Sequence, residues 1–172
     1  MKKLYINCGS GLSGDMMLGA FINMGVPADH LKEKLARLRL DEFELSIEEK
    51  MIGKKSVTDV DVILKDRTNL HKAPYSGVYR NYRQIVDMIN NSALSNNVKV
   101  LSRRIFDIKA KAEAKVHEVP IDKVQFHEAG AVDSIVDIVA AAVCLDNLDI
   151  DQVIVPKLCE GSGFVRCQHG TI

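Results

Sequence analysis

The chain of 172 residues carries 23 Lys and Arg against 23 Asp and Glu, so its formal net charge is zero. A single domain is expected at this length, and 47% hydrophobic with 27% charged residues exclude bulk disorder. The balanced charge disfavours a nucleic-acid partner, and no apolar run is long enough to predict a membrane span. The cytoplasm is the expected compartment, because the cysteines are too few and too irregularly spaced for a secreted disulfide framework: Cys8, Cys144, Cys159 and Cys167.

The first half of the chain predicts a strand, two helices and a β-hairpin, in that order. A short apolar run that ends at a glycine-rich turn is typical of a buried strand. Helical spacing of apolar residues follows, with Ser13 or Asp15 as the first cap and Gly25 after the end. Two alternating segments around a turn at 53–55 then predict the hairpin. The ranges are 4–6 for the strand, 13–24 and 28–40 for the helices, and 43–48 and 57–64 for the hairpin.

The second half predicts three helices and two short strands after an aperiodic loop at 66–77. The last helix is apolar nearly all round, which is typical of a buried helix. The predicted fold class is therefore mixed α/β, with a small sheet that includes a β-hairpin and is covered by about five helices. The ranges are 79–89, 98–116 and 130–148 for the helices, and 153–155 and 164–165 for the strands.

Residues 9–14 match the pattern G-x-G-x-x-G between a predicted strand and a predicted helix. Such glycines let backbone N–H groups approach a phosphate, and the helix N-terminus adds partial positive charge. A dinucleotide-binding fold would need a parallel strand directly after the first helix, where this sequence predicts a second helix. Phosphate or anion binding and a structural tight turn both stay open. The candidate nucleotide-binding residues are Gly9, Ser10, Gly11, Ser13 and Gly14.

A second cluster surrounds the start of the predicted buried helix. Asp133 and Asp137 are four residues apart and therefore share one helix face. Two carboxylates on an apolar helix are costly unless they are paired, protonated or bound to a cation. A histidine beside carboxylates, here His127 with Glu128, suits a divalent metal or a general base. In the structural alternative, Asp133 caps the helix or bonds to nearby backbone, and Asp137 meets an arginine from elsewhere.

Two further groups complete the candidate metal site. Asp15 would repel an anion but could hold a metal ion that bridges to one. Near the chain end, Cys159, Cys167 and His169 suggest thiolate and imidazole ligands, although their spacing differs from that of zinc fingers and free cysteine is also common in cores. The predicted metal-ligating residues are Asp15, Asp133, Asp137 and His169.

Three motifs in this order resemble one known family, the LarC nickel-insertion proteins, which complete the nickel-pincer nucleotide cofactor of lactate racemase. The first motif is the strand at 4–6 with Cys8–Met16. The second comprises Ala112–His117 and Phe126–Val139, and the third Gly161–Val165 with His169 and Gly170. The resemblance runs nearly from end to end of the chain.

The resemblance implies a CTP-dependent cyclometallase of the lyase class. It would insert Ni(II) into pyridinium-3,5-bisthiocarboxylic acid mononucleotide, forming two Ni–S bonds and one Ni–C bond. Soft sulfur donors and a square-planar preference suit this metal. Forming the Ni–C bond removes a ring proton, so His127 and Glu128 are the candidate catalytic bases. The glycine loop at 9–14 is the expected phosphate cradle.

Two departures from the family pattern shape the expected function. The middle loop has only His71 where members carry a His-rich insertion, and this chain stops at Ile172, before the family's C-terminal domain associated with CTP and a divalent cation, Mg or Mn. We therefore expect residues 1–172 to form a single N-terminal domain that folds alone and needs a C-terminal partner domain for nickel insertion. The alternatives are a non-catalytic nickel-binding or assembly module and a nucleotide-binding regulatory domain. Homo-oligomerisation stays open.

Overall fold

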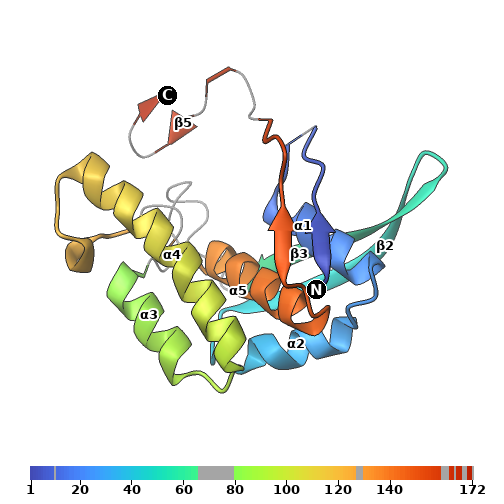
Figure 1. The fold of residues 1–172 in the computed structure, drawn as a ribbon, viewed down its shortest axis with the longest axis horizontal. Helices are drawn as coiled ribbons and strands as arrows, with labels where there is room; N and C mark the ends of the chain where they lie inside the picture. Colours follow the sequence, from blue (N-terminus) through green and yellow to red (C-terminus); the bar gives the residue numbers. More distant parts are fainter. Residues whose placement is uncertain are drawn as a thin grey trace.

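The computed structural model describes most of the chain: residues 1–9, 11–65, 80–126, 130–159, 163–164, 166–167 and 170–171. Within these ranges it contains five α-helices and six strands (Figure 1). The helices are α1 (Gly14–Asn23), α2 (Ala28–Ala36), α3 (Tyr82–Asn91), α4 (Asn96–His117) and α5 (Val132–Asn147), with a 3-10 helix η1 at Ile121–Lys123. The strands are β1 (Lys3–Tyr5), β2 (Phe43–Ile52), β3 (Lys55–Leu64), β4 (Gln152–Ile154), β5 (Arg166–Cys167) and β6 (Gly170–Thr171).

The predicted mixed α/β class with a β-hairpin and five helices is confirmed. The strands of the described residues do not join into one sheet but form three two-stranded pairs. β1 pairs in parallel with β4, the long strands β2 and β3 form the hairpin, and β5 pairs with β6. The parallel pair joins the first strand to the segment that follows α5, since Leu4 is opposite Val153.

Helix α5 is the centre of the hydrophobic core. It packs against α1, α2, α4 and β3, and Figure 1 shows it between the α3–α4 pair and the hairpin. This confirms the sequence prediction of a buried helix. Its buried residues are Val132, Ile135, Val136, Val139, Ala140, Ala141, Ala142, Val143 and Cys144.

Helix α1 connects this core to the hairpin. Leu18 and Phe21 are buried, and Asn23 at the end of the helix accepts a hydrogen bond from the Thr58 hydroxyl on β3 at 2.7 Å. Not every apolar residue of the predicted helix 13–24 faces the core, because Met16 and Met24 are 57% and 50% exposed. Sequence spacing alone did not show which side of this apolar helix faces the core.

Most predicted element bounds differ from the structure by a few residues, and two of the differences have a clear structural basis. Helix α2 ends at Ala36, four residues before the predicted Leu40, and Arg39 then adopts a left-handed conformation with φ of +56°. Such a backbone conformation cannot continue a right-handed helix. Phe164, predicted to lie in a strand, precedes β5 and is 89% exposed. Val165 and the predicted loop at 66–77 lie outside the described residues.

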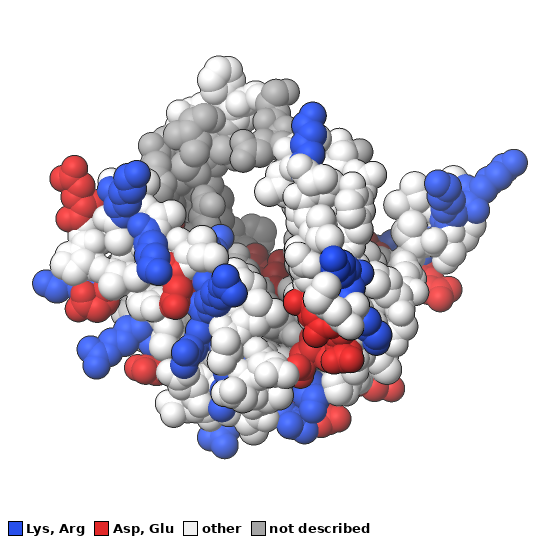
Figure 2. All heavy atoms as spheres, viewed as in Figure 1, with Lys and Arg blue, Asp and Glu red and all other residues white. Residues whose placement is uncertain are grey.

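Charges of both signs are mixed on the surface. On the face shown in Figure 2, Lys and Arg side chains lie among Asp and Glu side chains, as the zero net charge suggests. In the part of the chain that the structure describes, no helix has the length and apolar character needed to cross a membrane.

Candidate functional site

The glycine loop lies at the edge where the parallel strands β1 and β4 end. The pairing continues beyond the strands through a bridge between Cys8 and Leu158. Gly11 has a φ of +88°, and a side-chain carbon at this position would lie 3.8 Å from the carbonyl oxygen of Cys159. At this edge the first sequence motif therefore meets the segment that directly precedes the third motif. Ligands of parallel α/β sheets bind at the carboxyl ends of the strands, which makes the edge a candidate binding site.

Part of the hydrogen-bonding capacity of this loop is used within the loop itself. The amide of Gly11 donates to the carbonyl of Cys8 at 3.1 Å, and Ser13 accepts a hydrogen bond from the amide of Met16 at 3.2 Å. Ser13 is thus the N-cap of α1, as one of the two predicted alternatives stated. The amides of Gly14 and Asp15 at the first turn of α1 have no acceptor among the described residues. Such amides at a helix N-terminus can bind an anion.

Gly14 brings the glycine loop into direct contact with α5. A side-chain carbon at Gly14 would overlap the carboxylate of Asp137 and lie 2.9 Å from its Cβ. The two helix N-termini are therefore adjacent, and the first and second sequence motifs meet here. Close packing against Asp137 alone explains a glycine at this position, in keeping with the structural alternative for the loop.

Three carboxylates gather beside this contact: Asp15 on α1, and Asp133 and Asp137 on α5. Burial, then the charges of Asp15 and Asp133, raise the pKa of Asp137 from 3.8 to about 6. The pKa of Asp15 is also raised, first by burial and then by the charges of Asp61, Asp59 and Asp133. Asp137 therefore lies within the field of Asp15 and Asp133, and Asp15 within that of Asp133. A proton or a cation would relieve the repulsion.

The hydrogen-bonding states of Asp133 and Asp137 differ. Asp133 is exposed, and its Oδ1 accepts a hydrogen bond from the amide of Ser134 at 2.7 Å. This contact agrees with the structural alternative of bonding to nearby backbone. Oδ1 of Asp137 is buried and has no hydrogen-bond partner among the described residues, and the arginine foreseen as its alternative partner is not found there. Asp137 is therefore the carboxylate most in need of a ligand.

The remaining predicted site residues fall outside the described ranges: Ser10, His127, Glu128 and His169. Gly9 is exposed, next to the bridge at Cys8. Cys159 is a free, half-buried thiol. Among the described residues, no group of three or more His, Cys, Asp or Glu side chains is arranged to hold a metal ion. The predicted ligand set of Asp15, Asp133, Asp137 and His169 thus stays a prediction.

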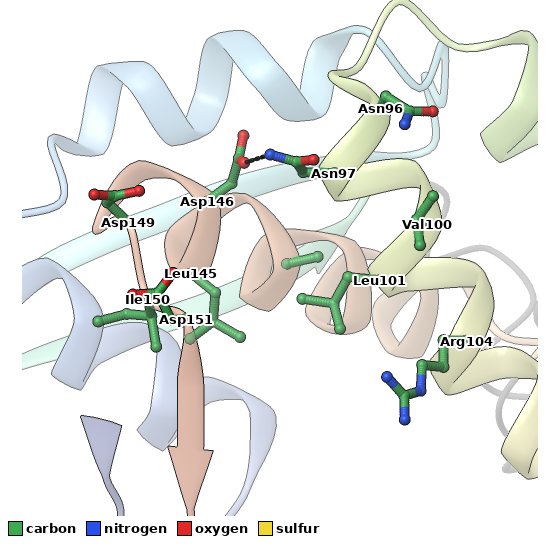
Figure 3. A pocket seen from close by; sticks show the side chains of 11 residues that line it. Asn96, Asn97, Val100, Leu101, Arg104, Leu145, Asp146, Asp149, Ile150 and Asp151 are labelled. Carbon is green, nitrogen blue, oxygen red and sulfur yellow. Dashed lines mark hydrogen bonds between the residues drawn. The ribbon is translucent and has the colours of Figure 1, made fainter. Parts of the chain in front are cut away.

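Sequence reasoning missed a cavity of about 440 Å³ between α4 and the end of α5 (Figure 3). Leu101 and Arg104 on α4 face Leu145 and Ile150 across it. Asp146 at its rim is already bonded, since it accepts from Asn97 at 3.1 Å and from Ser95 at 2.9 Å. Apolar residues on a pocket wall have the same helical spacing as core residues, so no sequence signal distinguishes them.

Sequence reasoning also gave no role to the pair of Glu113 and His117 on the last turns of α4. His117 Nε2 lies 3.2 Å from Glu113 Oε2. The spacing of four residues was a usable signal, because side chains at i and i+4 are neighbours on a helix surface.

Comparison with known proteins shows the family to which the chain belongs. The profile of the nickel insertion protein family matches residues 4–172. The chain belongs to this family. Relatives named pyridinium-3,5-bisthiocarboxylic acid mononucleotide nickel insertion protein are 46% identical in Acetivibrio thermocellus and in Alkaliphilus metalliredigens, and 43% identical in Geobacillus kaustophilus. These matches cover 100%, 99% and 99% of the chain but 42%, 43% and 42% of the relatives. No solved structure matches the chain.

Membership in the nickel insertion family confirms the resemblance found in the sequence. The chain spans less than half the length of these relatives, so they have a further region in addition to the part matched here. The names of these relatives assign nickel insertion and cofactor biosynthesis to the family. The first and second motifs, which meet where Gly14 packs against Asp137, are therefore the candidate location of its chemistry.

Proposed function

We propose that this chain forms the N-terminal part of an enzyme that inserts nickel into pyridinium-3,5-bisthiocarboxylic acid mononucleotide, and that the substrate binds where β1 and β4 end. One observation carries the proposal. Gly14 packs against Asp137, so the loop that follows β1 and the carboxylates of α5 form one surface. Family membership and the printed names of the relatives support the substrate.

This edge carries two kinds of group: backbone amides, which suit the phosphate of the substrate, and carboxylates, which suit a metal ion. The amides of Gly14 and Asp15, at the positive end of α1, would bind the phosphate of the mononucleotide. Asp15, Asp133 and Asp137 would attract a divalent cation, which would also allow an anionic substrate to approach three carboxylates. The unpartnered Oδ1 of Asp137 supports this role.

A base is needed for the Ni–C bond. The ring carbon that binds nickel gives up its proton, and the electron pair of the C–H bond becomes the Ni–C bond. His127 and Glu128 directly precede α5 in the sequence and stay the predicted bases, with His169 as a further nickel ligand. An imidazole or carboxylate accepts such a proton once it is within hydrogen-bond distance.

The further region of the relatives would supply CTP binding with Mg or Mn, as expected from the family resemblance. Apolar side chains on and beside the parallel strand pair support a docking surface for it: Tyr5 is 63% and Leu158 66% exposed, and Val153 and Val155 are about 40% exposed. Parallel sheets are normally covered on both faces, so an uncovered pair is unusual. We place the complete enzyme in the lyase class, maturing lactate racemase in the cytoplasm, where free thiols such as Cys8 and Cys159 persist.

Metallation of the purified precursor tests this function. With nickel, CTP and precursor, we expect no turnover by the chain alone and CTP-dependent turnover when the further region is added as a separate protein. In that mixture, Asp137→Asn should lower the rate at least about tenfold, because loss of a metal-site carboxylate or its supporting groups typically costs 10–100-fold.

Asp29→Asn, on the exposed side of α2, is the matched control and should keep the wild-type rate. Full turnover by the chain alone would show that the further region is dispensable. A wild-type rate for Asp137→Asn would exclude this edge as the site of insertion. Nickel binding without turnover in the complete mixture would favour the alternative of a non-catalytic assembly module.

A further inference from the structure

The C-terminal end of α4 carries a pair of metal-binding side chains that lies apart from the carboxylates of α1 and α5. Glu113 and His117 are one helical turn apart, with Nε2 and Oε2 separated by 3.2 Å. Their side chains are 29% and 31% exposed, so both are partly buried but reachable from solvent. The pair lies in the segment 112–117, which the sequence analysis singled out and the proposed function does not use.

The pair opens into a pocket of about 280 Å³. Its walls come from the end of α4, from η1 and from the segment that follows it: Glu113, His117, Val119, Lys123, Val124 and Gln125. Because one water molecule occupies roughly 30 Å³ in the liquid, the pocket has room for an ion with several bound waters. The negative end of the α4 dipole, which ends at His117, favours a cation here.

The donor atoms and their spacing suit a divalent transition metal. Imidazole nitrogen is a favoured ligand of nickel, and a carboxylate oxygen commonly completes mixed N/O sites. Two donors at adjacent corners of an octahedral ion lie roughly 3 Å apart when each metal–ligand bond is about 2.1 Å. The observed 3.2 Å between Nε2 and Oε2 is close to that separation. The pair can therefore chelate one ion with little change in geometry.

A site with two protein ligands is suited to an ion that must be passed on. Structural metal sites use four protein ligands and hold their ion tightly. Here two ligands leave the other positions to water or to an incoming sulfur donor, so the ion can exchange.

We infer that Glu113 and His117 form a loading site that takes up the nickel ion before its insertion. The identity of the ion as cargo rests on the proposed function, whereas the binding itself does not. Gln125, on the pocket wall, is two residues before His127 in the sequence, so the loading site adjoins the segment that carries the predicted base. Lys123 lines the same pocket, and its positive charge opposes a cation there, so binding would depend on the two ligands of the pair.

Direct nickel binding to the chain tests the loading site without precursor, CTP or turnover. We would titrate Ni²⁺ into the protein by calorimetry and follow paramagnetic broadening of backbone amide signals by NMR. The expected result is early broadening at Val119, Val124 and Gln125. His117→Ala and Glu113→Gln should each weaken this binding at least about tenfold.

Two matched variants serve as controls. Lys123→Ala removes the cation from the pocket and should leave the affinity unchanged or raise it, and His30→Ala on α2 should leave it unchanged. Glu113→Gln keeps the shape of the side chain, so its fold can be checked by circular dichroism and a folded protein is expected. Wild-type nickel affinity in both His117→Ala and Glu113→Gln, or broadening confined to Asp15 and Asp137 with none at Val119, Val124 and Gln125, would overturn the inference. Failure of metallation with intact binding at this pair would count against the proposed function alone.

Discussion

Carboxylates occupy helix ends of opposite polarity in this protein. At the N-terminal ends of α1 and α5, Asp15, Asp133 and Asp137 have no cationic side-chain partner among the described residues, and burial raises the pKa of Asp137 to about 6. At the C-terminal end of α4, Glu113 faces the imidazole of His117. The helix dipole favours anions at the first location and cations at the second.

The difference shows what each region lacks. The carboxylates of α1 and α5 repel one another, so a cation or a proton has to complete them. Glu113 already has a partner in His117, so a metal ion would replace an existing contact instead of filling an unsatisfied one. A stronger effect of mutation on stability is therefore expected at the α1–α5 contact than at the end of α4.

Gly14→Val should have the largest effect on stability. A side chain at Gly14 would overlap the carboxylate of Asp137. Forced overpacking typically costs 1–3 kcal/mol, so we expect a loss of about 3 kcal/mol in urea unfolding. Adding Asp137→Ala to the variant should recover part of the loss, because it removes the overlapping atoms.

The control for this prediction is Gly9→Ala, whose added carbon would lie 3.6 Å from Oδ1 of Asn7, an ordinary contact. Its stability should stay close to that of the wild type. A Gly14→Val protein as stable as Gly9→Ala would mean that α1 and α5 are not in contact at this point.

Asp137→Asn should change the pH dependence of stability. The folded-state pKa of about 6 lies above the ordinary 3.8, so the folded protein holds this proton more tightly than the unfolded chain. Stability should therefore fall as pH rises between about 3.8 and about 6, and then level off. The Asp137→Asn variant lacks this fall in stability. It should therefore be more stable than the wild type at pH 7 by roughly 1 kcal/mol after allowance for solvent screening.

Thermal unfolding from pH 4 to pH 8 measures this effect, with the exposed Asp122→Asn as control. A divalent cation added at pH 7 should stabilise the wild type more than Asp137→Asn, because it replaces the missing proton. Parallel pH curves for the wild type and Asp137→Asn would contradict the expected environment of this carboxylate.

Ser13→Ala tests the N-terminal end of α1 itself. Ser13 accepts the hydrogen bond of the Met16 amide, and loss of such a cap typically costs about 1 kcal/mol. Ser13→Thr should keep most of the stability, since a threonine hydroxyl can cap in the same way. Equal stability of the alanine and threonine variants would show that the cap does not contribute.

Glu113→Gln should have the smallest effect on stability. A partly exposed ion pair at i and i+4 contributes roughly 0.3–0.5 kcal/mol, and less at high salt. Chemical unfolding at low and high ionic strength should therefore differ little between this variant and the wild type. A loss of more than about 2 kcal/mol would mean that Glu113 supports the fold, and the contrast between the two regions would then fail.

The sequence predicted the fold well where a periodic pattern was long. The alternation of apolar and polar residues in 43–64 predicted the hairpin, and the apolar run of α5 predicted the central helix. Both predictions were correct because each pattern follows directly from which residues are buried. Prediction from the sequence was less accurate for segments that are short or apolar throughout. Both Met16 and Phe21 are apolar, but only Phe21 is buried, and the core-facing side of α1 depends on partners distant in the sequence.

The candidate site was predicted by residue type but not by arrangement. Asp133 and Asp137 could be placed together because they share a helix face. That Gly14 packs on Asp137, and that Gly11 approaches Cys159, depends on the pairing of β1 with β4, which are about 150 residues apart. Such long-range contacts leave no local pattern, so the meeting of these segments could not be derived from spacing.

Mapping the bound precursor on the chain tests the central claim most directly. We would titrate pyridinium-3,5-bisthiocarboxylic acid mononucleotide into the isotope-labelled protein and follow the amide signals by NMR. The substrate site at the edge where β1 and β4 end predicts the largest shifts at Gly11, Asp15 and Cys159. Shifts confined to the cavity between α4 and α5, at Asn97 and Leu145, would contradict it.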